Sequence, residues 1–476
     1  MEYEVVIGLE VHAELSTKSK LYCSCTTEFG GEPNTHCCPI CMGMPGTLPV
    51  LNKKAVEYAV RAGLATNCTI SEYSRKDRKN YFYPDLPKAY QNSQYYYPIC
   101  KNGYIEIETE NGSKRIGITR IHIEEDAGKL LHDEWGTGTL VDCNRGGVPL
   151  IEIVSEPDMR SAEEARAYLE NLKAILQYIG VSDCKMQEGS LRADVNLSVR
   201  RKGDTKFGVR TEMKNLNSFK AITRAIESEA KRHIYEIESG GTLVQETRRW
   251  DDEKGLSFSM RNKEEAKDYR YFPDPDLPPV VLSKEWIEEI MRSLPELPEA
   301  RRKRYIAEYS LPEYDASLIT KSKALADFFE EAVALCNNPK SVSNWIMGDI
   351  LRKMKDEEQE TEEIPIPAQY LADLIILVDK GVISNTIAKK VFNKMYETKK
   401  DPKVIVKEEG LEVVNDESAL IEIVKKVIEK NPQSVADFKS GKEKAFGFLV
   451  GQAMKETKGK ANPQLINKLL REELSR

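Results

Sequence analysis

Apolar and polar residues alternate along short segments in the first three fifths of the chain, which is the pattern of β-strands with one buried face. Turn signals such as Asn111-Gly112 and Lys202-Gly203-Asp204 separate the segments. Two helical patterns lie between them, at residues 161–178 and 219–238. The first has Ser161 as its N-cap and Glu164 to close a capping box. We predict a largely antiparallel sheet, with strands at residues 5–14, 104–108, 116–124, 191–200 and 209–214.

In the last two fifths, the apolar residues recur with the period of an α-helix. Amphipathic helices are predicted at residues 324–335, 343–354, 368–380 and 384–396. An acidic stretch at residues 356–363 interrupts them, and a solvated linker explains it best. One more helical stripe ends at Asn431-Pro432 and consists of Leu420, Ile423, Val424, Val427 and Ile428. We expect an α+β protein with a sheet domain at residues 1–292, a helical domain at residues 293–402 and a small helical tail at residues 403–476.

The composition is that of an ordinary globular protein, with 40% hydrophobic and 31% charged residues. No apolar run reaches the roughly 18 residues of a membrane span, and the first residues lack the basic and apolar parts of a signal peptide. We therefore expect a cytoplasmic protein that makes no membrane contact. Its ten cysteines should then be thiols or metal ligands and not disulfides.

Four cysteines near the N-terminus form the pattern C-x-C-x12-C-x2-C, namely Cys23, Cys25, Cys38 and Cys41. Four thiolates at this spacing are typical of a tetrahedral zinc site. Because four protein ligands leave no position open for water, the zinc is expected to be structural. Cys37 is an alternative third ligand, and the two-residue spacing to Cys41 favours Cys38.

The strand predicted at residues 5–14 places Glu10, His12 and Glu14 on one face, where a solvated surface or a cation site would produce the same pattern. Two further strands mix acids and bases on one face, with Arg192, Asp194, Asn196, Ser198 and Arg200 on one and Arg210, Glu212 and Lys214 on the other. Such faces suit a nucleotide with its metal, because acids bind magnesium and bases bind phosphate oxygens. The chain has no P-loop motif and no strand-linked G-x-G-x-x-G, so an ATP site would be of neither kind.

Two segments, residues 75–85 and residues 269–274, combine tyrosines with arginine and lysine. Their composition suits phosphate groups or the end of an RNA acceptor stem, since unpaired bases stack on aromatic rings. Packed loops rich in tyrosine are the alternative.

Taken together, these segments closely resemble one family, the B subunit of the glutamyl-tRNA(Gln)/aspartyl-tRNA(Asn) amidotransferase. The resemblance covers essentially the whole chain, and this set of motifs in this order is very specific. The cysteine pattern belongs to it, as do the strings Ile7-Gly8-Leu9-Glu10-Val11-His12, Asp77-Arg78-Lys79-Asn80-Tyr81-Phe82-Tyr83-Pro84-Asp85, His122-Ile123-Glu124-Glu125-Asp126-Ala127-Gly128-Lys129, Glu212-Met213-Lys214-Asn215-Leu216-Asn217-Ser218, Asp268-Tyr269-Arg270-Tyr271-Phe272-Pro273 and Lys458-Gly459-Lys460-Ala461-Asn462-Pro463.

The resemblance implies a cradle domain of the glutamine synthetase/guanidino-kinase type, followed by a helical domain and a YqeY-like helical tail. It also implies an ATP-dependent reaction. The side-chain carboxyl of Glu or Asp mischarged on tRNA(Gln) or tRNA(Asn) is phosphorylated, and ammonia then displaces the phosphate to give the amide.

The same resemblance implies the residues that carry the chemistry. His12 and Glu125 are expected to bind magnesium, with Glu10 and Glu212 close by and Glu124 a weaker candidate.

Contacts to the nucleotide and the substrate are expected from a second set of residues. The strand faces assign Arg192, Asp194 and Lys214, together with Glu212, to nucleotide or phosphate contacts. The resemblance places Lys79 and Tyr81 at the substrate end or on the path of ammonia.

Glutamine hydrolysis is implied to lie elsewhere in the assembly. The resemblance implies that an amidase, the A subunit, supplies ammonia through a tunnel, and that a small C subunit ties the two together. In agreement, no cysteine lies in a recognisable Cys/His setting and no G-x-S-x-G elbow occurs.

The C-terminal tail is basic in an otherwise acidic protein of net charge −7. Residues 438–476 hold seven lysines and two arginines against four glutamates, a net charge of +5. Local positive charge favours the tRNA backbone, and the candidate contacts are Lys455, Lys458, Lys460 and Lys468. A basic helical cap without RNA contact is the alternative.

Two other functions stay open at this point. A free-standing ATP-dependent carboxylate–amine ligase would act without tRNA and leaves the basic tail unexplained. A zinc-bearing tRNA-binding scaffold would consume no ATP and leaves the acid-lined strand faces unexplained.

Overall fold

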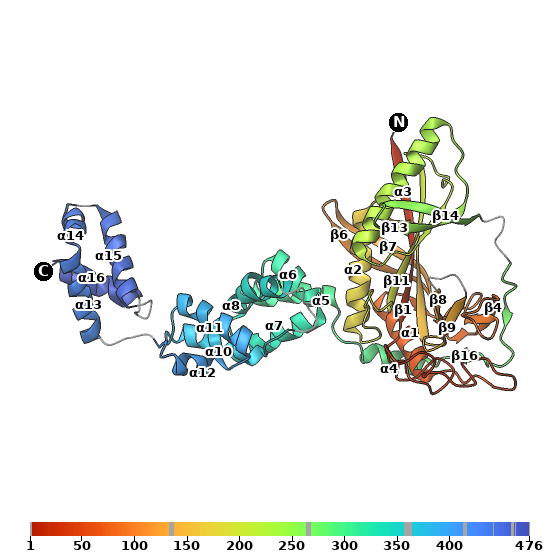
Figure 1. Ribbon diagram of the computed structural model, residues 1–476, viewed down its shortest axis with the longest axis horizontal. Coiled ribbons are helices and arrows are strands. Elements are labelled where there is room, and N and C mark those ends of the chain that lie inside the picture. Colours follow the sequence, from red (N-terminus) through yellow and green to blue (C-terminus); the bar gives the residue numbers. More distant parts are fainter. Residues whose placement is uncertain are drawn as a thin grey trace. The chain divides into compact units, whose positions relative to one another are not determined.

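The computed structural model divides into two compact units, Met1–Pro298 and Glu299–Arg476 (Figure 1). It describes residues 2–132, 138–262, 268–356, 364–412, 417–440, 442–457, 461 and 463–475.

A nine-stranded sheet is the centre of the first unit (Figure 1). Its order is β14 (Leu256–Asn262), β13 (Glu246–Asp251), β12 (Thr211–Lys214), β11 (Leu191–Arg201), β1 (Tyr3–Glu14), β10 (Pro149–Ser155), β7 (Gly112–Glu125), β6 (Cys100–Thr109) and β2 (Thr69–Ile70). Within the described chain, its neighbouring strands pair antiparallel except β12 and β13, which run parallel. This confirms the largely antiparallel sheet expected from the alternating pattern.

Among the described residues of this unit, smaller sheets and four helices accompany the large sheet. The sheets are β15 (Phe272–Pro273) with β4 (Asp77–Asn80) and β5 (Tyr90–Ser93), β16 (Val280–Val281) with β3 (Tyr73–Ser74), and β8 (Lys129–His132) with β9 (Thr139–Asp142). The helices are α1 (Lys53–Ala65), α2 (Ala162–Tyr178), α3 (Phe219–Ser239) and α4 (Lys284–Arg292).

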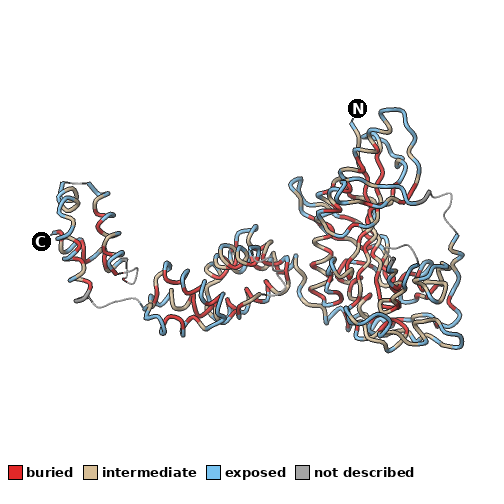
Figure 2. The backbone as a smooth tube through the Cα atoms, in the orientation of Figure 1, coloured by how far each residue is buried: buried red, intermediate tan, exposed pale blue. Residues whose placement is uncertain are grey.

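One face of the large sheet is apolar and packs on helices. Val11, Ile151 and Leu197 are fully buried and belong to the same cluster as Tyr168 of α2 and Ile222 of α3. Figure 2 shows the buried segments following the strands and the helices that lie against them. The intervening strand positions point to the opposite face, since successive side chains of a strand alternate. That opposite face is where the polar residues of the predicted cradle lie.

The second unit is helical. Its elements are α5 (Pro298–Tyr309), α6 (Glu313–Thr320), α7 (Lys323–Cys336), α8 (Pro339–Trp345), the π-helical turn η2 (Ile346–Ile350), α9 (Leu351–Asp356), α10 (Ala368–Asp379), α11 (Asn385–Thr398), α12 (Pro402–Glu408), α13 (Glu417–Lys430), α14 (Pro432–Lys439), α15 (Glu443–Glu456) and α16 (Pro463–Ser475). Leu420, Val424 and Val427 form a small core with Leu449 and Leu470, as the apolar stripe predicts. The α+β class is confirmed, and the bounds 1–292, 293–402 and 403–476 stay a prediction.

Two helical predictions need correction in detail. Residues 343–354 are not one regular α-helix, because the π turn η2 separates α8 from α9. Gly348 lies in that turn, and glycine is a poor helix former. At α2, Ser161 is the N-cap as predicted, but the carboxylate of Glu164 accepts a hydrogen bond from Arg160 N at 2.8 Å and not from the cap residue.

The N-cap of α2 yields a test of local stability. Ser161 Oγ accepts a hydrogen bond from Glu164 N at 3.1 Å, so Ser161→Ala should weaken the first turn by about 1 kcal/mol. Amide hydrogen exchange of Glu164 and Ala165, whose N–H groups bond Ser161, should then become roughly fivefold faster. Ser161→Asp, which keeps a capping acceptor, should retain native protection. Equal protection in the alanine variant would contradict this role of Ser161.

Candidate active site

The strand register gathers polar side chains on the open face of the sheet. Glu10 of β1 lies opposite Asp194 of β11, and His12 of β1 lies opposite Glu152 of β10. Glu152 in turn lies opposite His122 of β7. Because directly paired residues of antiparallel strands point to the same face, these five side chains share one surface.

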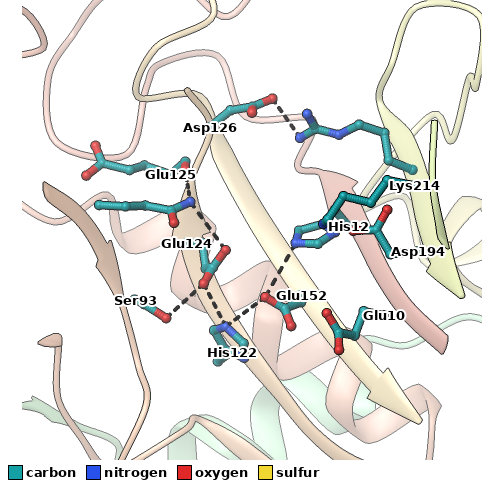
Figure 3. A network of polar contacts seen from close by, with 12 residues as sticks. Glu10, His12, Ser93, His122, Glu124, Glu125, Asp126, Glu152, Asp194 and Lys214 are labelled. Atoms are coloured by element: carbon teal, nitrogen blue, oxygen red, sulfur yellow. Dashed lines mark hydrogen bonds and ion pairs between the residues drawn. The ribbon is translucent and has the colours of Figure 1, made fainter. Parts of the chain in front are cut away.

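The first acidic group consists of His12, Glu124 and Glu152, whose ligand atoms lie within 4.8 Å of one another. His122 links its carboxylates, with Nε2 at 2.9 Å from Glu124 Oε1 and 3.4 Å from Glu152 Oε2 (Figure 3). His12 Nε2 lies 3.4 Å from the same Glu152 oxygen. Ser93 Oγ donates a 2.8 Å hydrogen bond to Glu124 Oε1. Two imidazoles and two carboxylates thus meet in a largely buried position.

The charges in this group support one another. Burial by itself lowers the pKa of His122, but the carboxylates of Glu152 and Glu124 outweigh it and raise the pKa to about 9. Burial opposes ionisation of Glu152, yet the two imidazoles hold the pKa of its carboxyl well below the usual range. The proton on His122 therefore compensates part of the buried negative charge.

The second acidic group consists of Glu10, Asp194 and Glu212, again with ligand atoms within 4.8 Å of one another. Lys214 Nζ lies 2.7 Å from Asp194 Oδ2 and 2.9 Å from Glu212 Oε1. Asn196 Nδ2 donates to Glu10 at 2.9 Å. Burial raises the pKa of Glu10, and the carboxylates of Glu152 and Glu212 raise it further. Since Glu152 belongs to the first group, the two groups are electrostatic neighbours.

Glu125 lies apart from both groups. As the neighbour of Glu124 along β7 it points to the other side of the strand, where it contacts Lys88 Nζ and accepts a 3.0 Å hydrogen bond from Asn92 N. A cavity of about 120 Å³, lined in part by Lys88, Glu125 and Cys41, opens there. The structure therefore brings Glu124, and not Glu125, to His12.

Arg192 and Lys79 lie outside the two acidic groups. Arg192 Nη2 pairs with Asp126 Oδ2 at 2.9 Å, although the register sets Arg192 opposite His12. Lys79 Nζ lies over the ring of Tyr269, 4.9 Å from its centroid, and its charge helps to lower the pKa of Glu124. Lys79 thus borders the first group, whereas Arg192 belongs to a neighbouring ion pair.

Sequence reasoning missed Glu152 and His122. A signal for each was present, because Glu152 stands between Ile151 and Ile153, and His122 stands between Ile121 and Ile123. A polar residue between buried apolar neighbours on a strand points away from the core, to the face that carries the chemistry.

The predicted cysteine ligands come together. The Sγ atoms of Cys23, Cys25, Cys38 and Cys41 lie within 4.8 Å of one another, so the donor set fits a tetrahedral zinc ion. The Sγ of Cys37 instead contacts the carbonyl oxygen of Asn34 at 3.1 Å. The geometry therefore favours Cys38 as the third sulfur.

A buried lysine adjoins this cluster. Lys20 is 1% exposed, and its Nζ lies 3.7 Å from Cys41 Sγ and donates to Cys143 O at 3.2 Å. A zinc ion bound by four thiolates carries a net negative charge, which an adjacent ammonium offsets.

The predicted tRNA contacts are only partly described. Lys455 lies exposed on α15, and Lys468 lies on α16, 4.0 Å from Glu472. Lys458 and Lys460 lie outside the described residues.

Known families match almost the whole chain. Residues 5–288 match the family described as the GatB/GatE catalytic domain, and residues 327–474 match the one described as the GatB domain. The chain belongs to the GatB family. This confirms the resemblance seen in the motifs.

Curated relatives of this family match over the full length. A protein of Caldicellulosiruptor bescii, named as the B subunit of aspartyl/glutamyl-tRNA(Asn/Gln) amidotransferase, is 68% identical, with 100% of both chains covered. A protein of the same name from Thermoanaerobacter pseudethanolicus is 63% identical, again with 100% of both chains covered. In the described part of this chain, no helix has the length and apolar character needed to cross a membrane.

The titration of His122 tests the first acidic group. In protein treated with a chelator, its imidazole should titrate with a pKa of about 9. Since this value lies above the ordinary value of about 6.5, the proton stabilises the folded state fully below about pH 6.5, and this stabilisation is lost as the pH rises through about 9. NMR of isotope-labelled imidazoles measures it, with Glu152→Gln as a variant that should lower the pKa. Titration of His122 near pH 6.5 in the native chain would show that the carboxylates do not hold its proton.

Proposed function

We propose that this chain activates the side-chain carboxyl of Glu or Asp carried by a mischarged tRNA and then converts it to the amide with ammonia. The observation that carries the proposal is the pair of neighbouring three-ligand groups, His12/Glu124/Glu152 and Glu10/Asp194/Glu212, on one face of the sheet. The relatives that match over the full length bear the name of one component of this amidotransferase.

The chemistry explains why such a face is needed. A carboxylate is a poor electrophile, and phosphorylation by ATP provides it with a leaving group that ammonia can displace. Catalysis of phosphoryl transfer is mainly positioning and charge neutralisation. A divalent cation, when bound, supplies the positive charge that balances the phosphate oxygens. Groups of carboxylates that contact few basic side chains are suited to bind such a cation.

The proposed magnesium ligands differ from those expected from the motifs. His12, Glu124 and Glu152 would hold one cation, and Glu10, Asp194 and Glu212 form the second candidate set. Lys214, which pairs with two acids of the second set, supplies a positive charge close to the phosphates. Glu125 is left out of the cation set because Lys88 and the Asn92 amide engage its carboxylate.

The substrate end of the site is assigned to the side that Lys79 borders. Its ammonium lies near Glu124, where it can attract the substrate carboxylate before phosphorylation. Glu125 and Lys88 line the cavity behind this face, and we assign them to the path of ammonia and not to the cation. Arg192 stays a candidate for phosphate contact once released from Asp126.

The cysteine cluster and the basic tail are assigned to structure and to binding, and not to the chemical steps. Zinc held by the four cysteines would be structural, because all four positions are filled by sulfur. Ammonia is proposed to arrive from the amidase, the A subunit, with the small C subunit joining the two in a cytoplasmic complex. The basic tail, with Lys455 and Lys468 on its helices, is proposed to contact the tRNA backbone.

ATP cleavage that depends on Glu-tRNA(Gln) tests the function. The chain, purified together with its partner subunits, should cleave ATP only when the mischarged tRNA is present. Glu152→Gln should lower this rate about 100-fold or more, because a charged ligand is lost where the phosphoryl charge develops. Glu156→Gln is the matched control, since Glu156 is exposed just beyond β10, where it accepts a hydrogen bond from Thr119 Oγ1 at 2.7 Å.

Two results would contradict the proposal. Robust turnover of free glutamate by the lone chain would indicate a small-molecule ligase. Full tRNA binding without any ATP cleavage, with all partners present, would indicate a scaffold.

The cysteine assignment has its own test. Cys38→Ser should lower the zinc content well below the native level of about one ion per chain, because a hydroxyl is a poor zinc ligand. Cys37→Ser is the matched control and should retain the metal, since its thiol faces Asn34. Elemental analysis of the purified proteins measures both. Loss of zinc in the Cys37 variant alone would reverse the assignment.

A further inference from the structure

The edge of β7 that faces β6 changes its partner where the functional residues begin. Among the described strands, β6 pairs with β7 only as far as Ile121, whereas β10 pairs with it as far as Glu125. The part of β7 beyond β6 carries His122 and Glu124 of the first acidic group. Because the backbone groups of Ile123 point to the same side as those of Ile121, they need hydrogen-bond partners that β6 does not provide.

Three side chains provide these partners. Ile123 N donates to Gln94 Oε1 at 2.9 Å, and Lys76 Nζ donates to Ile123 O at 2.6 Å. Two residues further on, Gln91 Nε2 donates to Glu125 O at 2.8 Å. We name Lys76, Gln91 and Gln94 the edge clamp. Its side chains continue along β7 the hydrogen bonding that the backbone of β6 provides before it.

Two members of the edge clamp are buried, which is unusual for their residue types. Lys76 is 1% exposed and Gln94 is 0% exposed, although lysine is almost never fully buried unless it has a partner. Burial lowers the pKa of Lys76 to about 7, while the carboxylates of Glu124 and Glu125 act to raise it. An amine donates hydrogen bonds with or without its extra proton. The bond from Lys76 to Ile123 O is therefore available in either charge state.

The small sheet β15-β4-β5 holds these two residues in position. Lys76 immediately precedes β4, and Gln94 immediately follows β5, with which β4 pairs. Gln94 Nε2 donates to Oγ of the fully buried Ser74 at 3.2 Å. The fully buried Asp77 accepts a 3.0 Å hydrogen bond from Tyr95 N at its Oδ2. Buried hydrogen bonds on both strands thus fix the clamp before its side chains reach β7.

The position of Glu124 depends on the peptide that the edge clamp holds. The carbonyl of Ile123 and the Cα atom of Glu124 lie in one planar peptide unit, so a shift of that carbonyl moves Glu124 with it. The carboxylate is held separately, because Glu124 Oε1 accepts a 2.8 Å hydrogen bond from Ser93 Oγ (Figure 3). The clamp therefore fixes the backbone of Glu124, and Ser93 fixes its side chain.

We propose that Lys76 and Gln94 are positioning residues for the first cation site, because they hold the Ile123 peptide from its two polar groups and so fix Glu124 where it can bind the cation. The inference rests on the proposed function, in which Glu124 is a ligand of that cation. Residues that orient a metal ligand without touching the metal typically change its affinity 10–100-fold when they are replaced. A clamp that only completed the hydrogen bonding of the sheet would change the stability of the fold and leave cation affinity unaltered.

Binding of Mn²⁺ to the chain in complex with its partner subunits tests this. Lys76→Met keeps the apolar stem and removes the donor, and should lower the Mn²⁺ affinity of the first acidic group about tenfold. Pulsed EPR identifies that group, because His12 is the only nitrogen ligand in the two candidate sets. Gln94→Leu should have the same effect. Gln94→Glu, which keeps an acceptor for Ile123 N at nearly the same volume, should restore most of the affinity.

The magnesium dependence of ATP cleavage provides a second measurement. With Glu-tRNA(Gln) present, Lys76→Met should need about tenfold more Mg²⁺ for half of its maximal rate and approach the native rate at saturating Mg²⁺. Thr66→Val is the matched control. Thr66 is fully buried, and its Oγ1 donates to Ala62 O at 2.8 Å, so this variant loses a similar side-chain bond to a carbonyl outside the clamp. It should change neither the Mn²⁺ affinity nor the Mg²⁺ requirement.

Two outcomes would overturn the inference. One is native Mn²⁺ affinity in both Lys76→Met and Gln94→Leu, and the other is an equal loss of affinity in Thr66→Val. Thermal unfolding shows whether each variant folds, and if Lys76→Met does not, the comparison of Gln94→Leu with Gln94→Glu decides. A native complex without tRNA-dependent ATP cleavage would remove the proposed function, whereas the Mn²⁺ affinities would still decide the role of the edge clamp.

Discussion

The pairing register of β1 with its two neighbours is the constraint on which the rest of the structure depends. It sets His12 opposite Glu152 on one side and Arg192 on the other, while Val11 faces the core. A slip of one residue would exchange the two faces of the strand and bury the polar residues. Burial of the apolar face therefore determines which side chains lie on the active-site face. The helices that cover the apolar face affect the chemistry because they fix this register.

This register also gives the open face of the sheet an excess of acidic side chains. Its carboxylates outnumber the cations that contact them. His122 bridges two of these carboxylates in the first group, and Lys214 pairs with two in the second. The raised pKa of Glu10 shows the remaining repulsion among the acids, on top of the effect of burial. A divalent cation would relieve that repulsion, so the arrangement of the acids favours cation binding.

Sequence patterns predicted the features that depend on residues close together along the chain. The strands, their faces, the Ser161 cap and the clustering of the four cysteines all follow from spacing along the chain. The partnership of His12 with Glu152 did not, because the two are far apart in the sequence and only the sheet order makes them neighbours. The choice between Glu124 and Glu125 likewise depends on the side to which each points, which the motif does not contain. The π turn at Ile346–Ile350 leaves no periodic signature distinct from that of a helix.

Strand β5 links the small sheet β15-β4-β5 to the active-site face. Ser93 Oγ donates to Glu124, and Tyr95 follows two residues later, so the Cα atoms of Ser93 and Tyr95 are at most about 7 Å apart. Hydrogen bonds hold both ends of this short span, since Tyr95 N donates to the buried carboxylate of Asp77. A movement of the small sheet would therefore be transmitted to Glu124 over a distance too short for the backbone to absorb it.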